Sequence, residues 1–539
     1  MAIHLTNVTV AGFRRFKEFS TDLSPSFNII VGNNESGKSS LLEAIGLALT
    51  GRIHGRLIKY AIDPYLFNRE NVTTFFERLR DGKDAAPPKI VIEAYLDSDE
   101  EVPELEKLRG SNNTRSEDCP GLVLTVKVES HHTESLKEYA ADKSNPDVIP
   151  VEFYHAPWRS FSGNGVAKRR LPFRTANIDA TLPRFSRGAS RYVSEVVEDV
   201  LSDEQRRDLA LEYRKLRHTF SQEPGVKAIN EHLKTKGNPA TTKDLSVQMD
   251  LSSKTSWDSS ITAHLDELPF DCAGQGEQCR VQLRLAIVGA EDSGIILIEE
   301  PENHLSHSNL NVLLEDIRND CEDRQVVVTT HSGYVLNKLG LDSLKLLSHS
   351  GSVMGLDGLT KGTRDYFVKL PGYDTLRLLL AKRAILVEGP SDELIVQSAY
   401  KKATGRLPLD DGIDVITVGS LAFKRFLEIA ALLTLDVRVV TDNDGDVAAL
   451  ERKYAEYLGD DSPPSVSIHF DSDEAAPSLE PQLLKANSRE VLNAILGTEL
   501  GDDHALLTYM RKNKTDCALK IFETEHDWTV PHYIQTSFE

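Results

Sequence analysis

The first thirty residues alternate polar and apolar positions and then change to a continuous apolar run. Leu5, Val8 and Val10 recur at strand-like spacing, and Phe27 to Val31 forms the apolar run. A glycine-rich segment follows, and from Lys38 to Leu49 the apolar residues are spaced as in a helix. The pattern predicts a strand, a tight turn and a helix, in that order.

Further along the chain the pattern predicts more strands, a helical region and a second sheet. Apolar residues favour strands at Lys89 to Leu96 and at Leu122 to Glu129, and Tyr192 to Leu233 has helical spacing with no strong turn before Pro224. After Ala384, apolar runs alternate with helical segments, as is typical of a parallel sheet. The strands expected there are 384–387, 415–418 and 437–440.

Length and composition agree with a large globular α/β protein. The 539 residues are several times the usual domain size of about 100–200 residues, and 40% hydrophobic and 27% charged residues are ordinary globular values. The predicted domains are two parts of one α/β domain (1–160 and 241–375), a helical insertion between them (161–240) and a C-terminal α/β domain (381–539). Five scattered cysteines without a C-x-x-C pair argue against a disulfide framework or a zinc ribbon.

Charge and targeting signals narrow the function classes. The formal net charge of -21 disfavours non-specific binding to nucleic acid or anionic membranes, although metal ions can neutralise carboxylates where a polyanion binds. The N-terminus lacks the pattern of a secretory signal, and no apolar run reaches the roughly 18 residues of a membrane span. We expect a soluble cytoplasmic protein that does not associate with membranes.

One stretch of the insertion reverses this charge balance. Between Phe161 and Tyr192, seven basic residues face a single acidic residue, Asp179. Such a stretch is a candidate for contact with phosphates, and an ordinary solvated or subunit-facing surface is the alternative. The basic residues are Lys168, Arg169, Arg170, Arg174, Arg184, Arg187 and Arg191.

The strongest single motif lies between the predicted strand and helix near the N-terminus. It matches G-x-x-x-x-G-K-S, in which backbone N–H groups and the helix N-terminus cradle phosphates. Lys38 is expected to reach the β- and γ-phosphates of ATP, and the Ser39 hydroxyl to bind Mg²⁺. The predicted nucleotide-binding residues here are Gly32, Asn33, Asn34, Glu35, Ser36, Gly37, Lys38, Ser39 and Ser40.

A second group of polar residues follows apolar runs far downstream. The run from Ile295 to Ile298 ends in Glu299 and Glu300, where the first carboxylate is expected to support Mg²⁺ and the second to polarise an attacking water. A glycine-rich segment precedes this strand, and another apolar strand runs into His331. From the glycine-rich segment, the predicted nucleotide-binding residues are Gly274, Gly276 and Gln278.

The order of these motifs resembles the ABC ATPase superfamily, in its SMC- and RecF-like branch. The glycine-rich segment takes the place of the family's signature, and His331 that of its switch histidine. In that family the signature of one subunit completes the nucleotide site of another. The resemblance therefore implies ATP as a cofactor and a homodimer or larger homo-oligomer.

An independent set of acidic residues lies at strand ends in the C-terminal region. The strand 384–387 runs into Glu388, with Asp392 shortly after, and the strand 437–440 runs into Asp442 and Asp444. Ligands bind beyond the carboxyl ends of parallel strands, so the two groups can converge on one point. Asp442 and Asp444 can share a hard cation, which predicts a site for Mg²⁺ or Mn²⁺.

This pair of motifs resembles the Toprim domain of topoisomerases, primases and certain nucleases. Further on, the segments around Glu480 and Lys514 resemble the later Glu and Lys motifs of Toprim nucleases that follow an ABC ATPase. The resemblance implies that Lys514 stabilises charge on the phosphate. It also implies that the metals are held by Glu388, Asp392, Asp442, Asp444 and Glu480.

An ABC-type ATPase joined to a C-terminal Toprim domain resembles the OLD (overcoming lysogenization defect) family of nucleases. The implied fold is an α/β ABC-type P-loop ATPase with a helical, dimerisation-like insertion, followed by a Rossmann-like Toprim domain. The implied activity is metal-dependent cleavage of DNA by a two-metal mechanism, often in antiphage defence, with an accessory defence protein as a possible partner.

Two other functions stay open at this point. The substrate can instead be RNA, for instance tRNA, because nothing in the sequence separates readers of the 2′-OH from readers of DNA. The chain can also be a nucleotide-dependent scaffold that senses DNA and whose acidic cluster is structural. A topoisomerase or a primase is disfavoured, since no strand-passage domain or tyrosine motif is recognisable.

Overall fold

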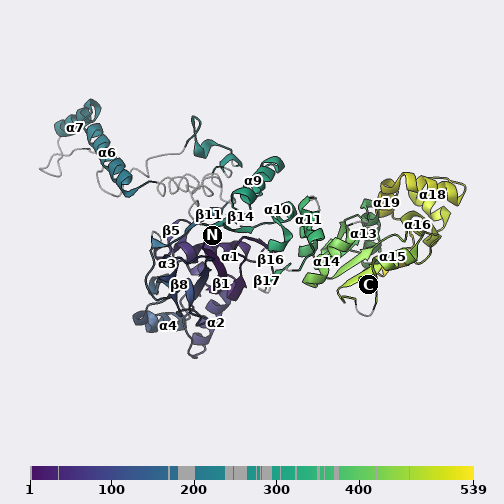
Figure 1. The fold of residues 1–539 in the computed structure, drawn as a ribbon, viewed down its shortest axis with the longest axis horizontal. Coiled ribbons are helices and arrows are strands. Elements are labelled where there is room, and N and C mark those ends of the chain that lie inside the picture. The colour runs from purple at the N-terminus through teal and green to yellow at the C-terminus, as the bar shows by residue number, and fades with distance from the viewer. Residues whose placement is uncertain are drawn as a thin grey trace. The chain divides into compact units, whose positions relative to one another are not determined.

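The chain divides into two compact units in the computed structural model. One unit comprises residues 1–26 and 39–328, and the other comprises residues 27–38 and 329–539. Each unit is described by itself below (Figure 1). The structure describes residues 3–33, 35–167, 170–179, 201–236, 247, 264–274, 276–278, 281, 294–303, 305–321, 324–348, 353–356, 358–369, 375–419, 422–459 and 462–538.

The first unit is built on an antiparallel sheet with the strand order β10-β8-β6-β1-β2. The long strands pair with apolar residues opposite one another, such as Val10 with Phe19 and Ile92 with Leu124, and these side chains are buried. The strands are β1 (His4–Phe13), β2 (Phe16–Asp22), β6 (Ile90–Asp97), β8 (Cys119–Val128) and β10 (Trp158–Ser160), with β7 (Arg109–Gly110) and β9 (Tyr154–His155) paired to β8.

Helices and a short parallel sheet complete the first unit. Strand β14 (Gly294–Glu299) pairs in parallel with β11 (Arg174–Asp179) and lies next to β15 (Gln325–Thr329). The apolar residues of β14 and β15 are buried, as expected of a covered parallel sheet. The longer helices are α1 (Lys38–Thr50), α2 (Arg69–Arg80), α4 (Thr133–Ala141), α6 (Asp203–Ser221), α7 (Pro224–Lys236) and α9 (His307–Asp320).

The second unit begins with a small sheet. Strand β3 (Phe27–Val31) pairs in parallel with β16 (Leu344–Leu347), and β17 (Val353–Gly355) adds to β16 in the antiparallel sense. One helix lies between β15 and β16 along the chain, and two more follow β17 and lead to the C-terminal sheet. They are α10 (Gly333–Leu339), α11 (Lys361–Lys369) and α12 (Thr375–Leu380).

The C-terminal part of the second unit is a parallel sheet with the strand order β19-β18-β20-β21. Because β18 (Arg383–Val387) pairs in parallel with both β19 and β20, the carboxyl ends of these strands meet at one edge. The other strands are β19 (Ile413–Thr417), β20 (Val437–Val440) and β21 (Val466–His469). The helices are α13 (Pro390–Thr404), α14 (Phe423–Leu433), α15 (Val447–Lys453), α16 (Leu479–Ala486), α17 (Arg489–Leu496), α18 (Asp503–Lys512), α19 (Lys514–Glu523) and α20 (His532–Gln535).

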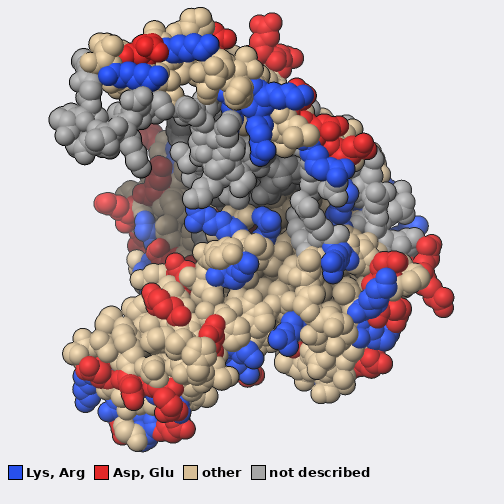
Figure 2. Space-filling view, turned by 90° about the vertical axis from the view of Figure 1, so that its left-hand side faces the viewer, with Lys and Arg blue, Asp and Glu red and all other residues tan. Residues whose placement is uncertain are grey.

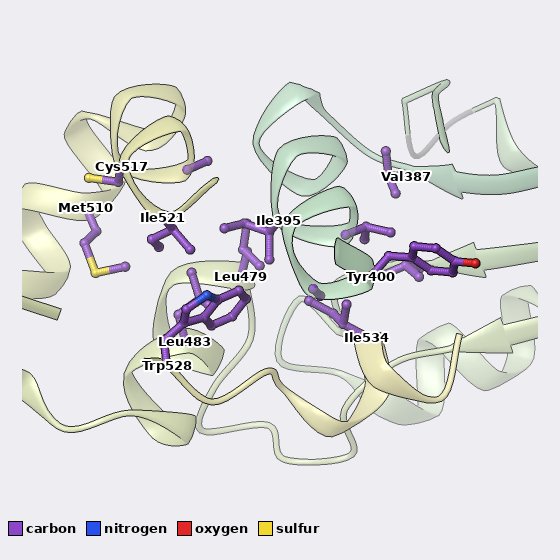
Figure 3. Close-up of a cluster of buried hydrophobic side chains, with 14 of the residues drawn as sticks. Val387, Ile395, Tyr400, Leu479, Leu483, Met510, Cys517, Ile521, Trp528 and Ile534 are labelled. Carbon is purple, nitrogen blue, oxygen red and sulfur yellow. The ribbon is translucent and has the colours of Figure 1, made fainter. Parts of the chain in front are cut away.

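A hydrophobic cluster lies behind this edge of the sheet. Leu479 and Leu483 of α16 pack there with Ile395 of α13, together with residues of α18, α19 and α20 (Figure 3). Nearly all of these side chains are buried, so the cluster fixes α13 and α16 with respect to β18. The two helices are therefore firm supports for any side chain that they direct toward the strand ends.

The predicted strands of this region agree with the structure within two residues, and the sheet is parallel as predicted. The boundaries 1–160, 161–240, 241–375 and 381–539 stay predictions. Residues 168–169, 180–200 and 237–240 of the expected insertion lie outside the described residues.

Packing against β8 gives a test of the first unit. A Cβ added at Gly121 would lie 2.1 Å from the ring of Phe161, a fully buried side chain that also contacts Tyr95 edge to face. We expect Gly121→Ala to lower the free energy of unfolding by about 1–3 kcal/mol through overpacking. Gly165→Ala is the matched control, because nothing lies within 4 Å of the added Cβ. Equal stability of the two variants in chemical denaturation would contradict this packing.

Candidate functional site

Two predicted groups of acidic residues meet at the carboxyl edge of the C-terminal sheet. Glu388 follows β18 directly, and Thr441 and Asp442 follow β20, the neighbouring parallel strand. The Thr441 hydroxyl donates to Glu388 Oε1 at 2.6 Å, and the Asp442 backbone N–H donates to the same oxygen at 3.3 Å. The structure thus brings Glu388 and Asp442 together through the register of β18 and β20.

Asp392 joins this group from the first turn of α13. Its carboxylate accepts a hydrogen bond from the Gly389 backbone N–H at 3.0 Å, which holds the side chain against the loop after β18. Burial raises the pKa of Asp392 to about 6, and repulsion from Glu388 adds to the effect. The carboxylate is therefore held close to another negative charge in a poorly solvated place.

Asp442 has the most perturbed carboxyl group of the site. Burial, as the largest cause, and the carboxylates of Asp392, Glu388, Glu480 and Asp444, in that order, together raise its pKa to about 8. These four side chains come from three segments of the chain, 388–392, 442–444 and 480, so the shift reports the convergence of these segments. Such a group of like charges, with Glu480 buried, Glu388 and Asp392 half-buried and Asp444 exposed, is typical of a functional site.

Asp444 is positioned by a tight turn. Asp444 and Gly445 have φ angles of 51° and 79°, in the left-handed region, and the Asp444 N–H donates to the Pro477 carbonyl at 3.1 Å. Buried Asn443 fixes the same turn, since its side-chain amide donates to the carbonyls of Asp471 and Asp473 at 2.7 and 2.9 Å. The turn holds Asp442 and Asp444 on a rigid support.

Glu480 reaches the site from α16. It is 3% exposed and lies beside the buried Leu479, so the hydrophobic cluster fixes its backbone. Its Oε2 accepts from the Ser478 hydroxyl at 3.0 Å, and its Oε1 pairs with Lys514 Nζ at 3.2 Å. The structure therefore brings both later predicted residues, Glu480 and Lys514, to the same acidic site.

The donor set fits divalent metal ions. Carboxylate oxygens are the ligands that Mg²⁺ and Mn²⁺ prefer, and a cation would offset the mutual repulsion that raises the pKa of Asp392 and Asp442. Within the described chain, no three of these acids bring one oxygen each within 4.8 Å of one another. As they stand in the structure, these carboxylates therefore do not form a closed three-ligand site for one ion.

Two buried tyrosines near these acids were missed in the sequence. The side chain of Tyr454 is fully buried, and its hydroxyl has no hydrogen-bond partner. Burial and the charges of Glu388 and Asp444 raise the pKa of Tyr454. Burial likewise raises the pKa of Tyr533, with Asp442 as the strongest charged contributor. No motif marks either residue, since each reaches the acids only through the fold.

The P-loop follows β3 as predicted from the sequence. Lys38 is 5% exposed, and its ammonium group donates to the carbonyls of Gly32 and Asn33 at 2.8 and 3.1 Å. Glu35 and Gly37 have φ angles of 65° and 101°, which curl the loop. Ser36 is buried, and Ser39 and Ser40 stand in the first turn of α1. Asn34 lies outside the described residues.

His331 lies next to the P-loop strand in the second unit. The Thr330 backbone N–H donates to the carbonyl of Ile30 in β3 at 3.2 Å, and His331 follows directly and is exposed. Ser332 then caps α10, with its hydroxyl accepting from the Val335 N–H. The hydrogen bond of Thr330 and the cap at Ser332 thus fix the backbone on the two sides of His331.

The remaining predicted nucleotide residues belong to the first unit. Glu299 ends β14, and Glu300 has a φ of 46° and accepts from the Asn303 amide at 2.7 Å. Gly274 is exposed and Gly276 is half-buried. Gln278 is 6% exposed, and its amide donates to the carbonyls of Phe270 and Ala273 at 2.9 and 3.1 Å. The Gln278 side chain therefore holds together the segment from Phe270 to Gln278, in which it lies itself.

The predicted basic stretch is only partly described. Arg170 and Arg174 are exposed, and Lys168, Arg169, Arg184, Arg187 and Arg191 lie outside the described residues. On the face drawn in Figure 2, Lys and Arg side chains are interspersed with Asp and Glu. The described part of that face therefore does not present a uniformly basic surface.

Comparison with known families agrees with the two sites. Residues 7–138 match the AAA domain, and residues 379–444 match the Toprim domain of overcoming lysogenization defect-like proteins. The class defined by fold and sites is a P-loop ATPase fused to a Toprim domain of the nuclease type. This order of domains matches an OLD-family ATPase–Toprim fusion and confirms the resemblance found in the sequence.

Curated relatives resemble the ATPase part. The chain is 38% identical over 69 residues to the DNA replication and repair protein RecF of Actinobacillus pleuropneumoniae serotype 5b, a match that covers 12% of this chain and only 19% of that protein. It is 24% identical over 392 residues to RecF of Streptococcus agalactiae serotype V, which covers 66% of this chain and 98% of that protein.

Solved structures of the same kind are distant. The recombination mediator RecF bound to ATP aligns over 66% of this chain and 99% of that chain, with 13% identity and a TM-score of 0.35. The Smc head domain of Pyrococcus furiosus aligns over 64% and 93%, with 12% identity and a TM-score of 0.31. Separately, no helix among the described residues is both long and apolar enough to cross a membrane.

The repulsion at Asp442 gives a test of the acidic site. A pKa raised to about 8 means that the ionised carboxylate opposes folding above pH 8, and that this penalty fades as the pH falls toward 4. In EDTA at pH 9 we expect Asp442→Asn to raise Tm by on the order of 2 °C or more. We also expect Mg²⁺ to stabilise the wild type more than the variant.

The control for this measurement is Asp99→Asn, which removes an exposed carboxylate in the loop after β6. It should leave Tm and the response to Mg²⁺ nearly unchanged. An Asp442→Asn protein that is less stable than the wild type at pH 9 would contradict the assigned repulsion.

Proposed function

We propose that this protein is an ATP-binding endonuclease that cleaves DNA phosphodiester bonds with Mg²⁺ or Mn²⁺ by a two-metal mechanism. The observation that carries the proposal is the convergence of Glu388, Asp392, Asp442 and Glu480 at the carboxyl edge of β18 and β20. A buried acidic site of this kind acts on a polyanion only when cations neutralise it. The match to an OLD-like Toprim domain supports the same chemistry.

In this proposal, Glu388, Asp442 and Asp444 hold the metals most directly, with Asp392 and Glu480 as further ligands. Bound divalent ions supply an activated water and stabilise the attacking and leaving oxygens of the phosphodiester. Lys514, now paired with Glu480, is placed to stabilise negative charge on the phosphate. The Tyr454 hydroxyl, buried beside Glu388 and Asp444, is a candidate hydrogen-bond donor within the site.

The ATPase part binds the nucleotide through residues 32–40. Lys38 exchanges its two loop carbonyls for the β- and γ-phosphates, and Ser39 and Glu299 support Mg²⁺. Glu300 polarises the attacking water and His331 contacts the γ-phosphate, while Gly274, Gly276 and Gln278 take the place of the signature. We propose each of these roles because the residue occupies the corresponding place in the order of the ATPase motifs.

We further propose that the protein acts as a homodimer or a larger homo-oligomer. Helix α6 exposes Leu209, Leu211, Leu216 and Phe220, with exposed fractions of 42 to 65%, which suits a subunit contact through the insertion. DNA is favoured as substrate because the curated relatives are named DNA replication and repair proteins. Antiphage defence in the cytoplasm, with an accessory defence protein, follows from the family resemblance.

The test of the proposed function is conversion of supercoiled plasmid to nicked and linear forms. We expect cleavage with Mg²⁺ or Mn²⁺, and loss of at least about a hundredfold in rate for Asp442→Ala. Asp99→Ala is the matched control and should keep the wild-type rate. Each protein is measured with and without ATP, which also shows the sign of the ATP effect.

Two outcomes would contradict the proposal in different ways. Metal-dependent cleavage of RNA without cleavage of plasmid would replace DNA by RNA as the substrate and keep the Toprim chemistry. Failure to cleave DNA or RNA, together with full activity of Asp442→Ala in cells, would favour a nucleotide-dependent scaffold with a structural acidic cluster.

Polar contacts within the second unit connect the segment after His331 to the Toprim helices. Buried Thr375 of α12 donates to Asn337 of α10 at 2.7 Å. Glu428 of α14 accepts from the backbone N–H and the hydroxyl of Thr360 and from the hydroxyl of Thr363. We propose that these contacts carry the effect of ATP to the Toprim domain.

Glu428→Ala tests this connection because it removes all three hydrogen bonds. We expect ATP binding and cleavage without ATP to stay within about twofold of the wild type, and the ratio of cleavage rates with and without ATP to fall by about threefold or more. Glu451→Ala, on the exposed side of α15, is the matched control. An unchanged ratio for Glu428→Ala would exclude this route.

A further inference from the structure

A compact group of metal-binding side chains lies in the first unit, in the segment between β8 and α4. Glu129 follows β8, and His131 and His132 form the 3-10 turn that leads into α4. Each of the three residues offers one ligand atom, and these atoms all lie within 4.8 Å of one another. It is the one such group found among the described residues, and neither the P-loop nor the Toprim site includes it.

The backbone holds this turn in a defined shape. The Glu129 N–H donates to the Phe153 carbonyl at 2.9 Å, which ties the end of β8 to the segment before β9. The His132 N–H donates to the Glu129 carbonyl at 2.8 Å and closes the turn. The His132 ring also contacts Phe153, with ring centroids 5.3 Å apart. The three side chains are therefore brought together before any ion binds.

The side-chain geometry fits a small transition-metal ion. Glu129 Oε2 and His131 Nε2 lie 3.3 Å apart, and the two imidazole centroids lie 4.0 Å apart. Tetrahedral Zn²⁺ with bonds of about 2.0–2.1 Å places its ligand atoms about 3.3 Å from one another. The carboxylate–imidazole distance of 3.3 Å therefore matches one edge of such a tetrahedron.

The ligand types also separate this group from the Toprim acids. Two imidazoles and one carboxylate suit Zn²⁺, Co²⁺, Ni²⁺ or Cu²⁺, whereas sites made only of carboxylates suit Mg²⁺ and Mn²⁺. His131 is exposed, and Glu129 and His132 are half-buried. A fourth coordination position is thus open to water or to another ligand.

We propose that Glu129, His131 and His132 form a transition-metal site of the Zn²⁺ class that clamps the end of β8 to the start of α4. Binding to the folded state alone would stabilise this part of the ATPase domain by mass action. A simple ion pair between Glu129 and a protonated His131 is the alternative explanation of the same distances. Metal binding at these three residues is independent of DNA cleavage at the Toprim acids.

The test is a titration of the full-length protein with Co²⁺ in the presence of excess Mg²⁺. Imidazole-ligated Co²⁺ of low coordination number absorbs visible light more strongly than Co²⁺ among carboxylates and water, so the absorption reports this site and not the Toprim site. We expect one strongly absorbing equivalent in the wild type. The His131→Ala/His132→Ala double variant should bind at least about tenfold more weakly, and Glu129→Gln should also bind more weakly.

The matched control is His504→Ala/His526→Ala, which removes two exposed histidines outside the first unit. A second measurement is the shift of Tm with Zn²⁺, expected for the wild type and the control and lost in the double variant. ATP binding by the double variant shows that the domain is folded. Equal Co²⁺ absorption in all proteins, or an absence of strong absorption in the wild type, would overturn the proposal and leave an ion pair.

Discussion

Repulsion among partly buried carboxylates is the constraint on which the C-terminal part of this protein depends. Burial and neighbouring acids raise the pKa of Asp442 to about 8 and that of Asp392 to about 6. No fold would gather such groups for stability, because each ionised form opposes folding. The hydrophobic cluster around Leu479, Leu483 and Ile395 supplies the opposing stabilisation, and it includes Val387 and Leu479, which directly precede Glu388 and Glu480 in the sequence.

Hydrogen bonds then decide how the charges are arranged. Thr441 and the Asp442 N–H both donate to Glu388, and the Gly389 N–H donates to Asp392, so each carboxylate has a fixed partner. The left-handed turn at Asp444 gives the site rigidity at further conformational cost. A preorganised metal site has ligands that are already fixed in position before the ion binds. The carboxylates of this site meet that description, since hydrogen bonds fix them although their repulsion lowers the free energy of unfolding.

The local sequence predicts most residues of the acidic site and of the P-loop. The other residues near these sites are recognised only from the tertiary structure. Glu388 and Asp442 were predictable because each follows an apolar strand, and parallel strands end at a common edge. Lys38 was predictable because its loop is one continuous motif. Tyr454 and the Glu129, His131 and His132 group were not predicted. The significance of Tyr454 arises from its burial, and that of the group from a turn that the Glu129 carbonyl closes and that the Phe153 carbonyl holds in place.

For other residues, the side-chain contacts differ from those that the motif predicts. Gln278 belongs to the expected signature, yet its amide is bonded to Phe270 and Ala273 because the segment folds back on itself. Glu480 and Lys514, assigned only by resemblance, form an ion pair at 3.2 Å in the acidic site. The spacing of the motifs therefore predicted where these segments lie in the sequence. The direction of each side chain depends on packing, which the spacing does not predict.

The measurement that tests the central claim most directly is anomalous X-ray scattering from crystals grown with Mn²⁺ and a non-cleavable DNA phosphorothioate. The account predicts two Mn²⁺ ions about 4 Å apart, held by Glu388, Asp442 and Asp444 at the ends of β18 and β20. A protein that binds the DNA mimic while Mn²⁺ is absent from these carboxylates, or is bound only elsewhere, would contradict it.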